Sequence, residues 1–314
     1  MIVTIRNSES NSSKAVYLTA VISAMTAIAK SKKTLVMQFT DPSEKSVANV
    51  LHGKAMKEED LSAIYRRFED EGLDALFIRA ESTDLVTEHF NECVTPMFEK
   101  ANLLDVLKPT KQLDYKKTLD ITKIEDILKS SQETYDMVYC LLPTKDKEII
   151  SAVKKCANEN LVCVRQNNVA ETLEEDETPV VYDFEEQSRF DMKYLRKKYG
   201  RKEMYLLPHN VEFNDAIIIE NVLDFMLKNK KDMKEDTNYA FTSSLLLLVT
   251  KYVTGIQKEK EEKEELIEKQ EYRKVKPVEP LKVIPEDGVQ EVTVKKGLFH
   301  KKKKIMMINM PEGE

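Results

Sequence analysis

The feature that most constrains the fold is a series of short, almost continuous apolar segments separated by longer polar ones. The apolar segments lie at 2–5, 35–39, 73–80, 135–142, 161–166, 179–184 and 204–208. Amphipathic stretches lie at 121–130, 146–158 and 190–198, and apolar helices are expected at about 13–30, 214–231 and 238–255. Strands buried on both faces read as continuous apolar runs, and parallel strands need helical crossovers. The sequence therefore predicts a doubly wound α/β domain, in which helices cover both faces of a mostly parallel sheet.

The composition changes after Gly255. Residues 256–274 are rich in Glu and Lys and predict a solvated helix, because opposite charges at helical spacing stabilise it. Residues 275–288 contain three prolines and predict an extended linker. Residues 289–314 form a basic and apolar tail. The expected organisation is an α/β domain over 1–255, followed by the charged helix, the linker and the tail.

The segment RNSESNSSKA, at 6–15, joins the first predicted strand to the first helix. In many α/β nucleotide-binding proteins this connection is a glycine-rich loop, whose N–H groups surround a phosphate at positive φ angles. The chain has 7 glycines and the first is Gly53, so no glycine-rich loop precedes that residue. The residues of a type favoured at helix N-caps are Ser10, Asn11, Ser12 and Ser13. We therefore predict a helix cap here, with Lys14 as a surface lysine at the helix start.

The order of these elements resembles that of the ParA/MinD family of P-loop ATPases, whose first loop has the deviant form KGGxGK(T/S). The segment 9–15 aligns with that loop and keeps its second lysine as Lys14. The segment KKTLVMQFTDPSEKS, at 32–46, is similar to the family's second strand and keeps its Asp-Pro pair as Asp41-Pro42. Further similarities lie in EGLDALFIRA, YDMVYCLLPT, LVCVRQNN and EMYLLPHNVEFNDAI. The resemblance covers roughly 1–255 and implies a P-loop NTPase-like fold that dimerises face to face across a nucleotide.

The departures from the family pattern fall where its chemistry needs particular residues. In the loop, Glu9 stands in place of the signature lysine and Ala15 in place of the Mg²⁺-binding hydroxyl residue. The positions of the loop glycines are occupied by Ser10, Asn11 and Ser13. Phe39 replaces one carboxylate residue, and Leu141 replaces the Walker B aspartate. Phosphoryl transfer needs a phosphate cradle, a bound Mg²⁺ and a group that positions water. We therefore expect no catalytic residue and no cofactor. The remains of the nucleotide site are then Ser10, Asn11, Ser12, Ser13, Lys14 and Asp41.

The cysteines and histidines favour no metal site. The 4 cysteines form no CxxC pair, and the 4 histidines form no pair at i, i+4 spacing. Single cysteines inside apolar runs are typical of a reducing cytoplasmic compartment. An alternative is a secreted protein, since the apolar run 15–29 resembles the core of a signal peptide. A strand and a mixed-charge segment precede that run in place of a short basic one, so a buried first helix is favoured.

The tail is the segment with a positive functional signal. Its basic and apolar candidates for partner or membrane binding are Lys295, Lys296, Leu298, Phe299, Lys301, Lys302, Lys303 and Lys304. Basic residues beside apolar ones suit an anionic membrane surface. Two other readings stay open: a β-hairpin or strand that docks on a protein partner, and a basic arm that touches nucleic acid. The net charge of −6 disfavours nucleic-acid binding by the molecule as a whole.

These observations lead to one functional hypothesis and one alternative. The hypothesis is a non-catalytic ParA/MinD-like pseudo-ATPase, similar to TadZ/CpaE-type proteins, acting as a homodimeric scaffold or localisation factor. It would serve a cell-envelope, pilus or secretion, or partition assembly with a protein partner, in the cytoplasm or at the inner face of the membrane. The alternative is an ATPase of plasmid or DNA partitioning that binds ATP in an unconventional cradle.

Overall fold

The computed structural model describes residues 1–8, 13–51, 71–82, 87–98, 103–110, 120–144, 146–167, 173–200, 203–229 and 237–255. The chain divides into two compact units, Met1–Glu265 and Leu266–Glu314. The second unit lies outside the described residues, so the predicted linker and tail do too. The predicted charged helix at 256–274 also lies outside the described residues.

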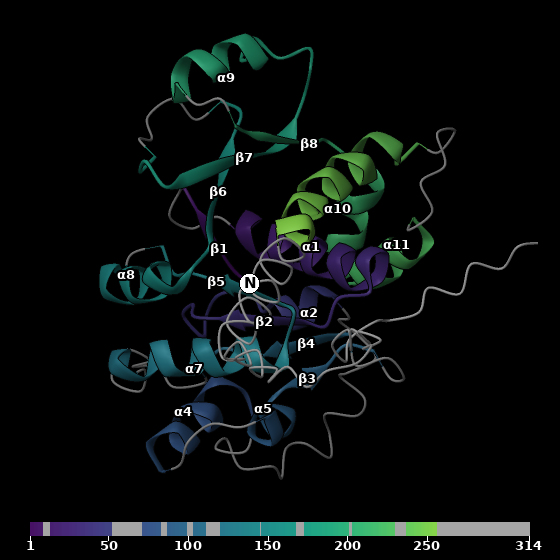
Figure 1. The fold of residues 1–314 in the computed structure, drawn as a ribbon. Helices are drawn as coiled ribbons and strands as arrows, with labels where there is room; N and C mark the ends of the chain where they lie inside the picture. The colour runs from purple at the N-terminus through teal and green to yellow at the C-terminus, as the bar shows by residue number, and fades with distance from the viewer. Residues whose placement is uncertain are drawn as a thin grey trace, which may run out of the picture. The chain divides into compact units, whose positions relative to one another are not determined.

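The core of the first unit is an 8-stranded sheet with the strand order β3-β4-β2-β5-β1-β6-β7-β8 (Figure 1). Its strands are β1 (Ile2–Asn7), β2 (Thr34–Gln38), β3 (Thr95–Pro96), β4 (Leu104–Leu107), β5 (Met137–Leu141), β6 (Glu159–Arg165), β7 (Glu177–Phe184) and β8 (Tyr205–Pro208). Every pairing is parallel except that of β3 with β4. The predicted doubly wound, mostly parallel α/β fold is confirmed.

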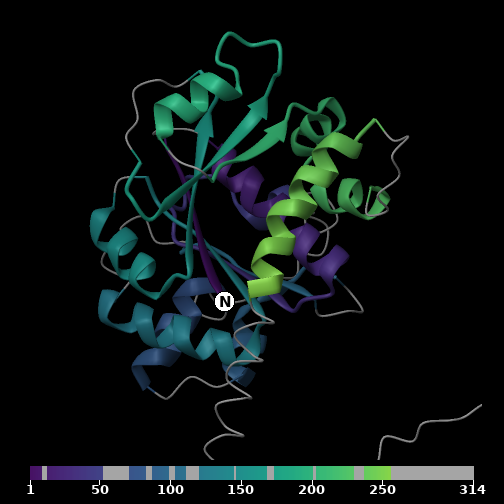
Figure 2. The same ribbon diagram turned by 45° about the horizontal axis from the view of Figure 1, so that its top comes forward.

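Helices cover both faces of this sheet. One face carries α1 (Lys14–Lys30), α2 (Val47–Leu51), α10 (Val211–Ile218), α11 (Val222–Lys228) and the helical segment 239–255. Figures 1 and 2 show that last segment, in yellow-green, on the same side as α1. The other face carries α4 (Gly72–Ser82), α5 (Thr87–Cys93), α7 (Ile121–Thr134) and α8 (Lys147–Cys156), with α9 (Met192–Tyr199) over β6, β7 and β8.

The first helix, α1, is buried nearly all round, as the apolar run 15–29 predicts. Side chains on every side of it are buried, including the four consecutive residues Thr19, Ala20, Val21 and Ile22. A helix that is apolar all round packs inside a core, whereas an amphipathic one lies on the surface. The Thr26 hydroxyl forms a hydrogen bond of 2.7 Å with the hydroxyl of Tyr139 on β5. Helix α1 therefore packs on the centre of the sheet, on the face that also carries α10 and α11.

One prediction from the apolar pattern is wrong, and the strand beside β2 is not among the predicted ones. Residues 73–80 form helix α4 and not a strand. Their buried side chains Leu73, Leu76, Phe77 and Ala80 recur at the i, i+3, i+4 and i+7 spacing of one helix face. The strand beside β2 is instead β4, which carries Asp105 in its middle. The Tyr135 hydroxyl donates to this buried carboxylate over 2.9 Å, so a charged residue type occupies the strand.

The predicted helix 214–231 is in fact two helices, α10 and α11. The chain turns at residues 219–221, where Glu220 has a φ of 56°. A glutamate in the left-handed region interrupts a right-handed helix, although the apolar pattern continues through it. The break lets both Phe213 on α10 and Phe225 on α11 pack in one aromatic cluster with Phe241.

Candidate functional site

The carboxyl ends of the parallel strands meet at one edge of the sheet, where open α/β proteins bind their ligands. Strands β1, β2 and β5 end there with Asn7, Gln38 and Leu141. Helix α1 begins at the same edge, directly after the segment that the family resemblance identifies as a former phosphate loop. This edge is therefore the candidate site.

The start of α1 is capped differently from what the sequence predicts. The Asn7 side chain at the end of β1 accepts a hydrogen bond of 2.8 Å from the N–H of Ala15. Ser13 occupies the N-cap position but makes no capping hydrogen bond with its side chain within the described part of the chain. Ser10, Asn11 and Ser12 lie outside the described residues. Ser13 therefore holds the predicted N-cap position but not the predicted side-chain capping bond, and the strand residue Asn7 bonds to the first turn.

Lys14, the first residue of α1, is held at the carboxyl edge by a carboxylate and an aromatic ring. Its Nζ forms an ion pair with Asp183 Oδ2 on β7. The same Nζ lies 4.5 Å from the centroid of the Tyr182 ring. Burial raises the pKa of the Tyr182 hydroxyl well above its ordinary value, so this ring is neutral. The lysine is therefore not the solvated surface residue that its cap position predicts, since only 23% of its side chain is exposed.

Asp183 reaches Lys14 because β7 is irregular at this point. The register between β7 and β8 shifts between Val181 and Phe184, and Asp183 has a φ of 56°. Bulges re-aim side chains, and an aspartate in the left-handed region costs backbone energy that its surroundings must offset. The other carboxylate oxygen lies 3.6 Å from His209 Nδ1, just beyond β8. Asp183 and His209 are site residues that the sequence analysis missed, because no motif marks them.

At the end of β2, an amide occupies the carboxyl edge. The buried Gln38 side chain donates to Thr40 Oγ1 over 2.8 Å and to the Lys45 carbonyl over 3.0 Å, and accepts from the Val47 N–H over 2.9 Å. All these bonds hold the chain between β2 and α2. The Asp41 carboxylate accepts from both the N–H and the hydroxyl of Ser43, and these hydrogen bonds lower its pKa. Asp41 thus starts a tight turn on the surface.

The end of β5 is apolar. Leu141 and Leu142 are 1% and 2% exposed, and the Leu141 carbonyl accepts a hydrogen bond from the Phe39 N–H.

Among the described residues, no group of three or more His, Cys, Asp or Glu side chains is placed to hold a metal ion. The 4 cysteines are free thiols, and no described helix is long and apolar enough to cross a membrane.

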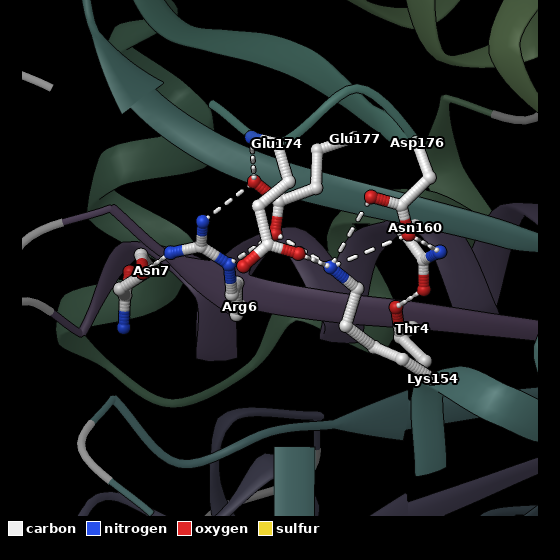
Figure 3. A network of polar contacts seen from close by, with 8 residues as sticks. All are labelled: Thr4, Arg6, Asn7, Lys154, Asn160, Glu174, Asp176 and Glu177. Carbon is white, nitrogen blue, oxygen red and sulfur yellow. Dashed lines mark hydrogen bonds and ion pairs between the residues drawn. The ribbon is translucent and has the colours of Figure 1, made fainter. Parts of the chain in front are cut away.

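A second polar cluster surrounds Arg6, which also donates to the carbonyl of Asn7 (Figure 3). Arg6 donates through Nε and Nη2 to the two carboxylate oxygens of Glu177, over 2.7 and 2.6 Å. The ammonium of Lys154 on α8 lies 3.1 Å from Glu177 Oε1 and 2.5 Å from Glu174 Oε2. Burial alone would raise the pKa of Glu177, but the hydrogen bonds from Arg6 and from the Glu174 N–H outweigh it and lower that pKa.

The same cluster extends across the sheet through neutral groups. Thr4 donates to Asn160 Oδ1 over 2.6 Å, and Asn160 donates to Asp176 over 2.8 Å. Thr4 pairs in register with Asn160, and Asn160 with Glu177, so the cluster ties β1, β6 and β7 together. Since all these polar groups satisfy one another, the arrangement is structural.

The fold has clear counterparts among solved structures, while no family model matches the sequence and no curated protein is similar to it. A ParA family ATPase from Chlorobium tepidum TLS is 9% identical, and the match covers 79% of this chain and 98% of that chain with a TM-score of 0.60. A putative plasmid partition protein from Borrelia burgdorferi B31, bound to AMPPNP, is 15% identical over 80% of this chain and 98% of its own, with a TM-score of 0.52.

A third structure is the complex of the cell division proteins MinC and MinD from Aquifex aeolicus. The matched chain is 13% identical, over 79% of this chain and 95% of its own, with a TM-score of 0.52. Together these likenesses show that the chain has the ParA/MinD fold.

Proposed function

We propose that this chain is a non-catalytic protein with the ParA/MinD fold, acting as a homodimeric scaffold or localisation factor for a larger assembly. One observation carries the proposal: the loop lysine that the family resemblance retains, Lys14, is neutralised by Asp183 and covered by Tyr182. A lysine that binds phosphate does so as a point charge, for which a carboxylate competes with the phosphate. Here a carboxylate of the same chain takes that place.

The rest of the edge supports the same conclusion. Phosphoryl transfer needs Mg²⁺, and Mg²⁺ prefers oxygen ligands, mostly carboxylates and waters beside the phosphates. Strand β5 ends in the buried Leu141. The side-chain amide of Gln38, at the end of β2, is hydrogen-bonded to the carbonyl of Lys45 and the N–H of Val47. Asp41 is turned toward Ser43. Leu141 and Gln38 have no carboxylate, and the carboxylate of Asp41 is hydrogen-bonded to Ser43, so none of the three supplies a carboxylate ligand for Mg²⁺ at the carboxyl edge.

A role in binding other proteins is supported by the comparison with MinD, whose solved complex contains MinC. We place the homodimer contact around the α1 edge and the protein partner elsewhere on the α/β domain or on the tail. Location in the cytoplasm, or at the inner membrane face through the basic tail, belongs to the same proposal. Liposome co-sedimentation of the full chain tests the tail: changing Lys301–Lys304 to Glu must abolish binding to anionic vesicles. If binding does not change, the tail does not act at a membrane.

Calorimetry with ATP and ADP, with and without Mg²⁺, tests the central claim on the wild-type chain and on Lys14→Ala. We expect no binding by either protein. Submillimolar binding that Lys14→Ala removes overturns the proposal and favours the alternative, a partition ATPase with an unconventional cradle. Light scattering on the nucleotide-free chain tests the dimer, and a monomer at every concentration contradicts it.

A further inference from the structure

Helix α9 carries a concentration of positive charge on a chain whose net charge is −6. Four of its 8 residues are Lys or Arg, and none is acidic. Lys193, Arg196 and Lys197 are exposed, while Leu195 is fully buried against β6 and β7. Because residues three and four apart share a helix face, these three cations form one basic strip.

A hollow with an apolar floor lies beside this strip. It has a volume of about 560 Å³, and its apolar lining comes from Phe184, Met192 and Leu206. Lys193 and Arg196 form part of its wall, together with Glu186 and Asp191. The Asp191 carboxylate accepts the N–H of Tyr194 at the start of α9, which directs it toward the helix. The hollow therefore combines an apolar lining with charged groups of both signs, and the basic strip of α9 adjoins it.

The outer face of α10 has the opposite character. Val211 is 64% exposed and Ile218 is 76% exposed, so two large aliphatic side chains of one short helix stand in solvent. Asp215 lies between them on the same face, at the i, i+4, i+7 spacing, and the exposed Glu212 adjoins it. Ile219, in the following turn, is 61% exposed. This face presents protruding aliphatic groups flanked by carboxylates.

The two surfaces belong to opposite faces of the same part of the sheet. Helix α9 packs on the cluster of Val162, Val164 and Val181, whereas α10 packs through Phe213 on the cluster that contains α1. Figure 1 shows the two helices on different sides of β7 and β8. Each helix has 8 residues, so each is about 12 Å long. One copy of the chain cannot bring its own two surfaces together, whereas two copies can.

We propose that the α10 face of one copy docks into the α9 hollow of a second copy, with Ile218 in the apolar floor and Asp215 against Lys193 and Arg196. Two different surfaces meet in this contact, so it is heterologous and leaves one free surface at each end of a pair. It involves neither Lys14 nor the tail, and it goes beyond the homodimer of the proposed function. It adds head-to-tail growth to the scaffold.

Sedimentation velocity with charge-reversed variants tests the contact. The α9 variant is Lys193→Glu with Arg196→Glu, and the α10 variant is Asp215→Lys, which leaves the hydrogen bond from Asn238 to Glu212 in place. We expect the wild-type chain to form species larger than a dimer at low salt, and to lose them near 1 M salt, where the screening length is about 3 Å. Each variant alone must lose these species. A mixture of the two must regain association, because each native surface then meets its native counterpart.

Two further proteins keep the test decisive. Lys147→Glu with Lys155→Glu makes the same charge change on exposed positions of α8, and must assemble like the wild type. Ile218→Asp changes a side chain that is 76% exposed, so it must fold normally and still lose assembly. Wild-type sedimentation of the α9 or α10 variant, or a mixture that does not associate, overturns the proposal. Loss of binding to DNA or anionic vesicles in the α9 variant, with unchanged sedimentation, assigns α9 to those surfaces and overturns it too.

Discussion

Lys14 at the start of α1 and Asp183 at the end of β7 form an ion pair although 169 positions separate them in the sequence. The pair joins the start of α1 to the end of β7 at the carboxyl edge of the sheet. Asp183 adopts a left-handed backbone conformation to reach the lysine. The charge of Lys14 is therefore balanced by a carboxylate of the same chain.

Replacing Asp183 by Asn removes the counter-charge of Lys14 and keeps the backbone, because asparagine also tolerates positive φ. We expect the affinity for inorganic pyrophosphate to rise at least about fivefold, the equivalent of about 1 kcal/mol for a partly exposed ion pair. Titration calorimetry at low salt measures the change. The rise must vanish in the double variant that also carries Lys14→Ala. Equal affinities in Asp183→Asn and the wild type would contradict the idea that Asp183 neutralises the lysine.

The capping of α1 is tested by two alanine substitutions. Asn7→Ala removes the acceptor for the Ala15 N–H, and we expect the free energy of unfolding to fall by about 1–2 kcal/mol. Ser13→Ala removes a hydroxyl without a capping bond, and we expect a change within about 0.5 kcal/mol. Urea denaturation of both variants provides the comparison. A larger loss in Ser13→Ala than in Asn7→Ala would restore the cap that the sequence predicts.

The parallel sheet and most of its strands could be predicted because burial on both faces leaves a direct trace in composition. Strands β5, β6 and β7 are almost continuous apolar runs, and the predicted positions are close to the observed ones. Helix α4 was misassigned because a short apolar run such as 73–80 fits both a buried strand and one helix face. Strand β4 was not predicted because Asp105 interrupts its apolar pattern. The hydrogen bond from Tyr135, which the sequence does not reveal, explains how a carboxylate can be buried there.

The candidate site was harder to predict than the fold. The absence of glycine before Gly53 can be read from the sequence alone. The sequence does not reveal that Asn7 caps α1 or that Asp183 pairs with Lys14, because both contacts join residues that only the folded sheet brings together. A bulge in β7 leaves no mark in the apolar pattern of 179–184.

Gly72 is required at the start of α4. Its φ is +82°, and a Cβ added there would lie 2.9 Å from the carbonyl oxygen of Lys108. Gly72→Ala must therefore adopt a strained conformation and displace backbone, and we expect a loss of about 2–3 kcal/mol in the free energy of unfolding. Gly200 is the matched control, because its φ is +56° and nothing lies within 4 Å of its added Cβ. Gly200→Ala should cost about 1 kcal/mol, and equal losses in thermal denaturation would refute the role of the Lys108 contact.

Glu177 makes the stability of the chain depend on pH. Its folded-state pKa lies below the ordinary 4.5, so between the two pKa values the unfolded chain binds more protons than the folded one. The stabilisation by its charge is therefore complete above about pH 5.5 and is lost as the pH falls through 4.5 to the lowered pKa. Glu177→Gln leaves Arg6 and Lys154 without their shared carboxylate, and we expect a loss of about 3 kcal/mol at pH 7.

The distinguishing result for Glu177→Gln is the shape of the pH profile. Its free energy of unfolding must fall less steeply between pH 5.5 and 3 than that of the wild type, because the charge that acid removes is already gone. The matched control is Glu125→Gln, since the exposed Glu125 also has a lowered pKa, through its hydrogen bond from Lys129, but stands in solvent. Solvent and salt weaken such a pair, so this variant should follow the wild-type profile. Parallel profiles for Glu177→Gln and the wild type in urea titrations would show that the Arg6–Glu177–Lys154 cluster does not control the acid sensitivity of the fold.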